Sequence, residues 1–202
     1  MKKYREFFTL IIFTLGLQAL IYFLIKVFIS DYNVINSKVN IPLIKEFVYI
    51  YNLWYLFVIL VVFLIYKYSK NNFKSLILTM LLGAFLAHIT FIIYPSMIKR
   101  PVVEVKNVTD WFLNFTYKVD TPAINCLPSM HCIYCFIIIF YALICKEIDY
   151  KKRIFIIIFS LLIVASTLFI KQHVIEDVVL ALIYSIIVIF LAKLISKRVW
   201  KD

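Results

Sequence analysis

The sequence contains very little glycine, since Gly16 and Gly83 are the only two among its 202 residues. It also has no low-complexity segment and no convincing internal repeat. These absences exclude a flexible Gly/Ser-rich linker and a repeat architecture. A chain of this length is therefore expected to form one domain over residues 1–202.

The sequence lacks the cysteine patterns that build a disulfide framework or a metal site. Cys132 and Cys135 have CxxC spacing, but both lie in an apolar run and no second pair completes a set of metal ligands. We interpret these two, with Cys126 and Cys145, as small residues that pack between helices. No metal and no other cofactor is expected.

Long apolar runs dominate the rest of the chain. Hydrophobic residues make up 64% of the sequence and the mean hydropathy is +0.97, whereas soluble domains are about half apolar. A helix that crosses a bilayer needs about 20 apolar residues, and six runs approach or reach that length. We therefore predict an all-α, polytopic membrane protein with six transmembrane helices in a bundle. The runs are Phe7–Ile29, Phe47–Tyr66, Leu76–Tyr94, Met130–Cys145, Ile154–Ile170 and Val174–Ile195.

Acidic residues are scarce, with eleven Asp and Glu against 22 Lys and Arg and a net charge of +11. If the loops alternate across a membrane, the termini and the 67–74 and 146–153 loops hold fourteen basic and four acidic residues. The opposite side holds eight and seven. This positive-inside pattern predicts cytoplasmic termini, in the plasma (inner) membrane, and it argues against nucleic acid as a partner. Membrane lipids are the expected surroundings, and the oligomeric state stays open.

One long loop, Pro95–Pro128, joins the third and fourth runs on the outer side. Within it, "VTDWFLNFTYKV" mixes aromatic and polar residues. Such a segment either lies flat at the membrane interface or forms a lid on the bundle, and the sequence favours neither.

Three polar clusters interrupt the apolar pattern. They are "YPSMIKRP" (94–101), "LPSMHC" (127–132) and "STLFIKQHVIED" (166–177). Under the topology derived from charge alone, all three lie at the outer membrane face. Their convergence predicts a site there.

His173 and Asp177 are four positions apart, which places them on one face of a helix. A carboxylate beside one imidazole nitrogen fixes the tautomer and makes the other nitrogen a better nucleophile. Asp177, with Glu176, also lies inside an apolar run, where a charge costs about 2.5–3.5 kcal/mol on insertion scales. We therefore interpret this pair as catalytic; the structural alternative is a polar clamp between helices.

His131 follows Pro128 and Ser129 at the start of the fourth run. Pro128 is expected to open the helix, so that the N–H groups of Ser129, Met130 and His131 face an anion. The Ser129 hydroxyl adds a donor. The sequence thus predicts a phosphate cradle with an acid beside it.

Two cations are candidates for binding the same anion. Arg100 can donate two hydrogen bonds to phosphate oxygens, and Lys171 can act as a mobile point charge. His88, in the middle of the third run, is interpreted as a residue that bonds between helices.

These clusters resemble the motifs of the type 2 phosphatidic acid phosphatase superfamily, which run Lys-x6-Arg-Pro, Pro-Ser-Gly-His and Ser-Arg-x5-His-x3-Asp. Arg100-Pro101 matches the end of the first, Pro128-Ser129-Met130-His131 the second with Met in place of Gly, and Ser166, His173 and Asp177 the third. Ile93 and Thr167 stand where the family has Lys and Arg. Lys171, one turn after Thr167 if the helix continues, is a candidate replacement.

The resemblance implies a metal-independent enzyme that transfers a phosphoryl group through a phosphohistidine. His173 is then the nucleophile, His131 the general acid and Asp177 the residue that orients His173. Arg100, Ser129, Lys171, Met130 and Ser166 are the phosphate-binding candidates. The pattern is similar to that of inositol phosphorylceramide synthase-like transferases and small bacterial lipid phosphatases.

Three functions remain open from the sequence. The first is a phosphatase for a lipid phosphate such as phosphatidic acid, a phosphatidylglycerol phosphate or a polyprenyl pyrophosphate. The second is a phosphotransferase that moves a phosphorylated headgroup between lipids. The third is a proton-coupled transporter that uses the His/Asp pair as a relay.

Overall fold

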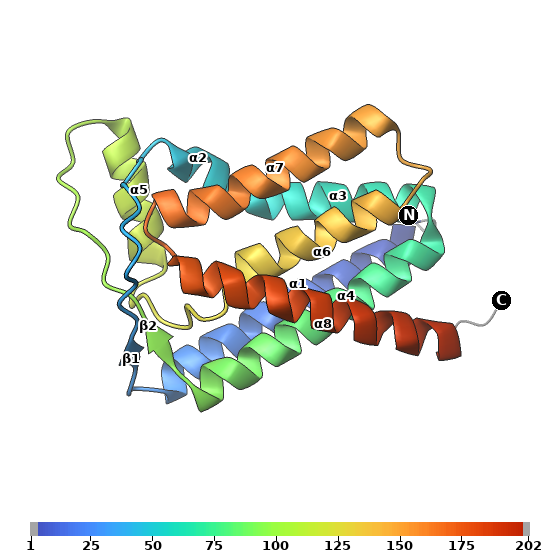
Figure 1. Ribbon diagram of the computed structural model, residues 1–202, viewed down its shortest axis with the longest axis horizontal. Helices are drawn as coiled ribbons and strands as arrows, with labels where there is room; N and C mark the ends of the chain where they lie inside the picture. The colour runs from blue at the N-terminus through green and yellow to red at the C-terminus, as the bar shows by residue number, and fades with distance from the viewer. Residues whose placement is uncertain (1–3, 200–202) are drawn as a thin grey trace.

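The computed structural model describes residues 4–199, and within them the chain is mostly helical (Figure 1). This confirms the predicted helical class. Two strands of two residues each were not predicted. The elements are α1 (Arg5–Phe28), β1 (Asn33–Val34), α2 (Phe47–Asn52), α3 (Trp54–Tyr68), α4 (Lys70–Ile93), β2 (Ser96–Met97), α5 (Val108–Val119), α6 (Met130–Ile144), α7 (Tyr150–Phe169) and α8 (Ile175–Val199).

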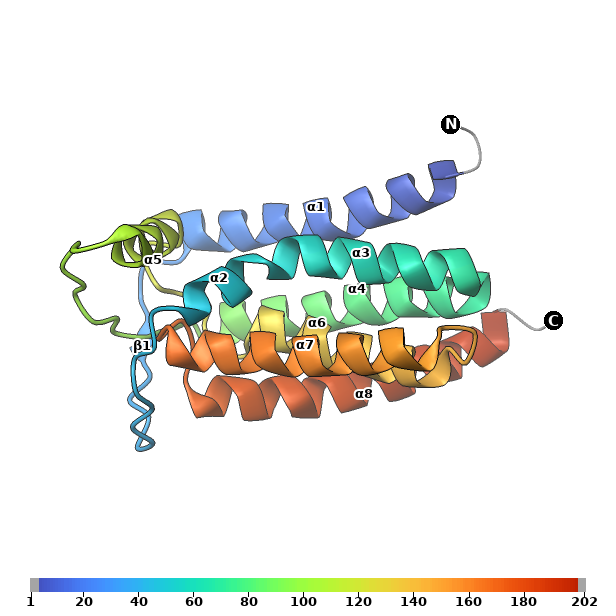
Figure 2. The same cartoon turned by 90° about the horizontal axis from the view of Figure 1, so that it is seen from above.

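The long helices run side by side, and the loops divide between the two ends of the bundle (Figures 1 and 2). We call the end that carries α2, α5 and the strands the site end. The opposite end, where α1 begins, α8 finishes and the α3–α4 and α6–α7 connections lie, is the terminal end. The basic 67–74 and 146–153 loops thus share one end of the molecule. Which side of a membrane this end faces stays a prediction.

Four helices are long and apolar enough to cross a membrane: α1, α4, α7 and residues Ile175–Ser196 of α8. This is compatible with an integral membrane protein. The helices α3 and α6 are apolar but have only 15 residues each. The predicted run Phe47–Tyr66 is divided at Leu53 into α2 and α3. The count of six spans therefore stays a prediction.

Side-chain caps explain where several helices begin. Ser69 accepts a hydrogen bond from the backbone N–H of Asn72 at α4, and Asp149 accepts from Lys151 and Lys152 at α7. Ser129 does the same for Cys132 at α6. Each cap satisfies a donor that a helix leaves free in its first turn. Because Ser129 is the cap, Pro128 precedes the helix and does not open it, which corrects that prediction.

The central helix is α6, whose side chains Ile133, Cys135, Ile137 and Ile138 have no exposed surface. It packs between α4, α7 and α8 (Figure 2). At 1.5 Å per residue, its 15 residues span about 22 Å, against about 36 Å for the 24 residues of α4. The first turn of α6 therefore lies below the site end of α4, inside the bundle.

At Gly83, side chains of α6 pack closely against the backbone of α4. A Cβ atom there would lie 3.0 Å from Cγ2 of Ile133 and 3.4 Å from Cδ1 of Ile137. Around Gly16, on α1, nothing lies within 4 Å of the same atom. The two glycines of the chain thus form a matched pair, one packed and one open.

We expect Gly83→Leu to lower the free energy of unfolding by about 1–3 kcal/mol, because a larger side chain overfills a packed contact. Gly16→Leu is the control, since both changes gain the same helix propensity. Thermal unfolding of the purified protein in one detergent measures both. Equal midpoints for the two variants contradict the close packing of α4 against α6.

The site end is tied together by polar contacts between distant segments. β1 pairs in parallel with β2, through Asn33 with Ser96 and Val34 with Met97. At the start of α5, Asp110 accepts a hydrogen bond from Lys45 Nζ at 2.8 Å, and this bond holds the pKa of Asp110 below its usual range. The charged pair fastens α5 to the segment before α2. The long loop is therefore ordered over the end of the bundle.

Candidate active site

The first turns of α6 and α8 are joined by their backbones. The N–H of Ser129 donates to the carbonyl of Asp177 at 3.3 Å. This contact brings the second and third polar clusters together. As a result, the ring centres of His131 and His173 lie 6.1 Å apart. The predicted meeting of these two clusters is thus present in the structure.

His173 and Asp177 form a direct pair, with 2.9 Å between Nδ1 and Oδ2. His173 precedes α8, so the two residues do not share a helical face as predicted. Instead Asp177, in the first turn, reaches back and also accepts from the N–H of Val174 at 3.1 Å. Because a carboxylate only accepts, the contact requires a proton on Nδ1, which in the neutral tautomer leaves the lone pair on Nε2.

The turn before His173 is a Schellman motif at the end of α7. The N–H of Gln172 donates to the carbonyl of Thr167, and that of Lys171 to the carbonyl of Leu168. Lys171 has φ 57°, in the left-handed region that glycine favours. The helix does not continue to Lys171, so this residue does not lie one turn above Thr167. Its Nζ instead donates to the carbonyl of Ile41.

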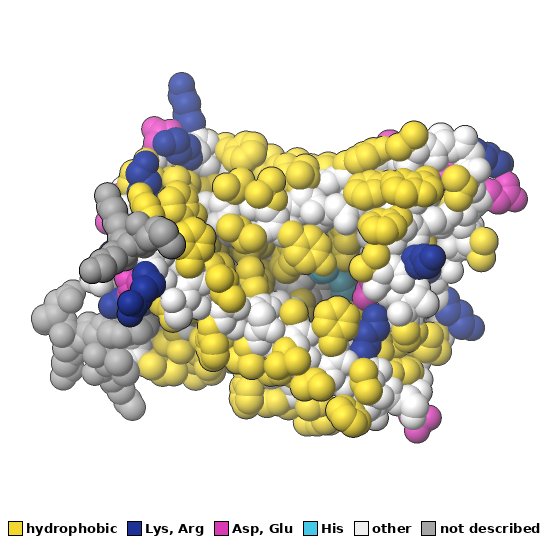
Figure 3. All heavy atoms as spheres, turned by 180° about the vertical axis from the view of Figure 1, so that it is seen from behind, with side chains coloured by type: hydrophobic (Ala, Val, Ile, Leu, Met, Phe, Trp, Pro, Cys, Tyr) yellow, Lys and Arg dark blue, Asp and Glu magenta, His cyan; other side chains and the backbone are white. Residues whose placement is uncertain are grey.

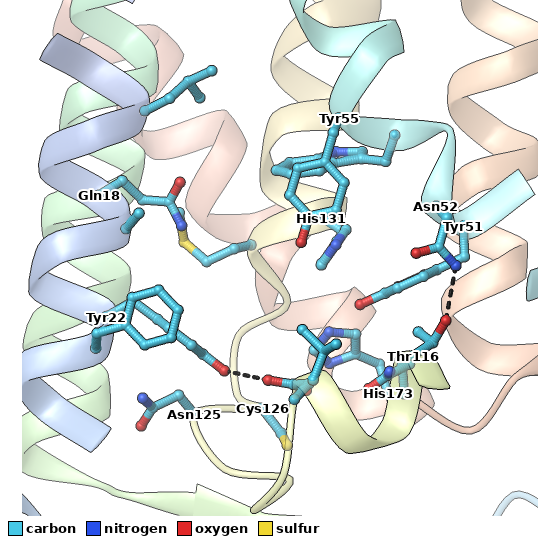
Figure 4. A pocket seen from close by; sticks show the side chains of 18 of the residues that line it. Gln18, Tyr22, Tyr51, Asn52, Tyr55, Thr116, Asn125, Cys126, His131 and His173 are labelled. Carbon is cyan, nitrogen blue, oxygen red and sulfur yellow. Dashed lines mark hydrogen bonds between the residues drawn. The ribbon is translucent and has the colours of Figure 1, made fainter. Parts of the chain in front are cut away.

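Both histidines line one cavity of about 430 Å³ (Figure 4). In the close view, the rings of His131 and His173 lie on one side, and Tyr22 and Asn125 lie across from them. Its walls come from α1, α2, α3, α5, the segment before α6 and the first turn of α6, and most of them are apolar. They include Leu15, Gln18, Ala19, Phe23, Lys26, Tyr51, Val58, Ile59, Phe115, Val119, Asp120 and Met130.

The cavity lies where α1 and α3 diverge. At the terminal end the two helices touch through Phe7, whose ring centre lies 5.2 Å from Phe63 and 5.4 Å from Tyr66. Toward the site end both helices instead line the cavity. Figure 3 shows histidine atoms at the bottom of a hollow surrounded mainly by hydrophobic side chains. The cavity thus opens on the apolar flank of the bundle.

Aromatic rings surround His131. Its ring centre lies 4.4 Å from that of Trp54 and 4.6 Å from that of Tyr51. Within the described part of the chain, its Nε2 has no hydrogen-bond partner. Burial among these rings removes the imidazole from water, so a positive charge on it is stabilised only when an anion such as a phosphate lies beside it.

Arg100 lies behind the cavity wall and is held there by hydrogen bonds to the protein itself. Its guanidinium donates to the Asp120 carboxylate, to the Gln172 side-chain oxygen, and to the carbonyls of Tyr117 and Asp120. Its side chain is 8% exposed. The first polar cluster therefore reaches the site, but Asp120 and Gln172 stand between Arg100 and the cavity.

The remaining phosphate-binding candidates occupy different places. Met130 lines the cavity, whereas Ser129 and Ser166 are fully buried. The Ser129 oxygen caps α6, and the Ser166 hydroxyl donates to the carbonyl of Ile163 at 2.6 Å. Neither serine lines the cavity, and their roles in phosphate binding stay predictions.

A second hollow, of about 340 Å³, adjoins the other side of the site. His173 and Val174 line it together with two cations, Lys99 and Lys171. The segment before α2 supplies Asn36, Ser37 and Asn40. His173 thus lies in the wall between an apolar cavity and a polar hollow.

Sequence reasoning missed several polar residues of the site, among them Tyr22, Lys26, Asp120, Asn125 and Gln172, all of which line the cavity. Tyr22 and Lys26 are four positions apart on α1, which is a signal that the sequence did contain. The other three lie in loops, where no periodicity marks their direction.

Among the described residues, the cysteines and the third histidine do not form a second reactive site. Burial raises the pKa of the Cys126 thiol at the cavity wall, so it remains protonated. His88 is buried in α4 and does not line the cavity. Among residues 4–199, no group of three or more His, Cys, Asp or Glu is placed to hold a metal ion.

Comparison with known proteins adds one match. The model of the PAP2 superfamily matches residues 75–201, which include all three polar clusters. No curated protein and no solved structure matches the chain.

Proposed function

Because the chain belongs to the PAP2 superfamily, whose members are phosphatases, we propose that it hydrolyses a lipid phosphate within the membrane through a phosphohistidine intermediate. The observation that carries this proposal is the position of His173. Its Nδ1 is held by a buried carboxylate, and its ring lies 6.1 Å from a second imidazole in an apolar cavity. One phosphoryl group can contact both rings there.

In the first step, Nε2 of His173 attacks phosphorus, and the bond from phosphorus to the lipid oxygen breaks. Protonated His131 gives its proton to that departing oxygen, so a lipid alcohol leaves. Asp177 balances the positive charge that develops on the His173 ring. The phosphoryl group is then bonded to His173.

In the second step, water attacks the phosphohistidine. Neutral His131 takes a proton from this water, the bond between nitrogen and phosphorus breaks, and inorganic phosphate is released. Both histidines return to their starting states. The sum is one lipid phosphate and one water converted to one lipid alcohol and one phosphate. No step is assigned to a metal ion, and independence of metals is part of the proposal.

The cavity supports a lipid as the substrate. It opens between α1 and α3 on the flank that bears exposed Phe23, Tyr55 and Ile59. Acyl or prenyl chains can pack there while the phosphate contacts the histidines. Phosphatidic acid, a phosphatidylglycerol phosphate and a polyprenyl pyrophosphate are the substrates we propose.

The proposal is tested by a screen of these lipids with purified, reconstituted protein, scoring phosphate release. A labelled donor lipid separates the alternative: free labelled phosphate indicates hydrolysis, and a new labelled lipid indicates phosphotransfer. Absence of both products from every phosphate and pyrophosphate lipid contradicts the proposal.

Lys171 offers a further prediction within this function. Its side chain lines the polar hollow together with His173, so the ammonium, which donates to the carbonyl of Ile41, can turn to a phosphate there and stabilise charge on its oxygens. Lys171→Ala is expected to lower kcat/KM by about 10²–10³-fold, the range for loss of one donor to a developing oxyanion. Phosphate release at substrate levels below KM measures this.

Lys171→Gly is the matched variant, because it removes the same ammonium and relieves the left-handed backbone. Both variants should lose activity equally, while Lys171→Gly is the more stable of the two. Recovery of wild-type turnover in Lys171→Gly means that the backbone, and not the ammonium, matters at this position.

A further inference from the structure

Three donors from two elements converge on one carboxylate at the cavity wall. On α1, the Tyr22 hydroxyl donates to Oδ1 of Asp120 at 2.7 Å and Lys26 Nζ to the same oxygen at 3.4 Å. The Arg100 guanidinium donates to Oδ2. A phenol, an ammonium and a guanidinium around one carboxylate form a built anion site. Figure 4 shows the Tyr22 hydroxyl pointing toward the centre of the cavity.

The charges at this site leave an excess of cations. Lys26 and Arg100 are 11% and 8% exposed, and they face the single carboxylate of Asp120. Asp120 follows α5 and is 31% exposed, so it can move outward more easily than either cation. Without its carboxylate, two buried positive charges would face the cavity together. An anion is the ligand that this arrangement stabilises.

Two unused amides mark the same wall. Among the described residues, neither Nδ2 nor Oδ1 of Asn125 has a hydrogen-bond partner, and Nε2 of Gln172 has none either. These residues are 4% and 2% exposed, and both line the cavity. Buried amides are normally satisfied, so these groups point to a polar ligand. Gln172 also directly precedes His173 and accepts from Arg100.

We propose that Asp120 occupies the place of a substrate's anionic group, and that Tyr22, Lys26 and Arg100 bind that group once Asp120 moves away. Lys26 thereby supplies a cation to the site from α1, outside the three polar clusters. The ligand is a phosphate or a second phosphate of a diphosphate. This inference rests on the proposed function for the identity of the substrate, but anion binding can be measured without turnover.

The test uses two variants that are expected to change KM in opposite directions. Asp120→Asn keeps an oxygen that accepts from Tyr22 but removes the competing charge, so it should lower KM for a lipid phosphate by about fivefold to tenfold. Lys26→Gln removes one cation and should raise KM by about tenfold, which is the effect of one charge-assisted hydrogen bond. In the Lys26→Gln background, Asp120→Asn should have a smaller effect, because the two groups are coupled.

The same variants are compared for binding of inorganic phosphate, read as protection of the full chain against thermal unfolding in detergent. Tighter phosphate binding by Asp120→Asn supports the inference even if no lipid phosphate is hydrolysed, an outcome that defeats only the proposed function. An unchanged or higher KM in Asp120→Asn, with an active wild type, overturns the inference. If Asp120→Asn does not fold, an unchanged KM and unchanged phosphate binding in Lys26→Gln overturn it alone.

Discussion

His173→Ala is expected to lower phosphate release from a lipid phosphate by on the order of 10⁶-fold, the loss seen when one member of a covalent catalytic group is removed. The structure leaves no second nucleophile in its place: among the described residues lining the cavity, the other imidazole is His131, the thiol of Cys126 is buried, and the ammonium of Lys26 is paired with Asp120. Measured initial rates with reconstituted protein give the ratio.

The matched control is His88→Ala, since His88 is the third histidine of the chain and lies buried in α4 away from the cavity. It should retain wild-type kcat. Labelled substrate should also leave acid-labile label on the wild type and none on His173→Ala. Label at wild-type levels on the variant would place the covalent bond elsewhere and refute the mechanism.

His131→Ala should slow the enzyme in a way that depends on the leaving group. With a lipid phosphate, whose alcohol needs a proton as it departs, kcat is expected to fall by about 10²–10⁴-fold. With p-nitrophenyl phosphate, whose phenolate leaves without a proton, the first step should change little. The second step still lacks its base, so the phosphohistidine accumulates.

The variant should therefore release a burst of about one p-nitrophenol per protein, followed by a slow steady phase. Rapid mixing with absorbance detection resolves the two phases. If kcat falls equally with both substrates and no burst appears, His131 only packs against Trp54 and Tyr51 and transfers no proton.

The sequence was sufficient for features that depend on local patterns. Long apolar runs predicted the helices, and the four-residue spacing of His173 and Asp177 predicted their contact. The contact forms although His173 lies outside α8, because a side chain in the first turn can reach back to the preceding residues. Spacing alone thus predicted the pair but not its geometry.

Features that depend on how distant segments meet were not predictable. The break at Leu53 and the pairing of β1 with β2 are set by packing at the site end. Likewise, Tyr22 and Asp120 are 98 positions apart. Their contact requires α1 to lie beside the end of α5, and no periodicity reports that. Lys171 is a third case, since its left-handed backbone replaces the expected extra helical turn.

His173 lies in the wall between the apolar cavity and the polar hollow, and its imidazole borders both spaces. On the proposed chemistry, a lipid arrives from the hydrocarbon side and its alcohol departs by the same route, while phosphate can leave on the aqueous side. The phosphorus atom hardly moves, so turnover needs no swing of the bundle between two open forms. An apolar inhibitor should then compete with the lipid for the apolar cavity, whereas a water-soluble inhibitor should compete with phosphate at the polar hollow, and both would contact His173.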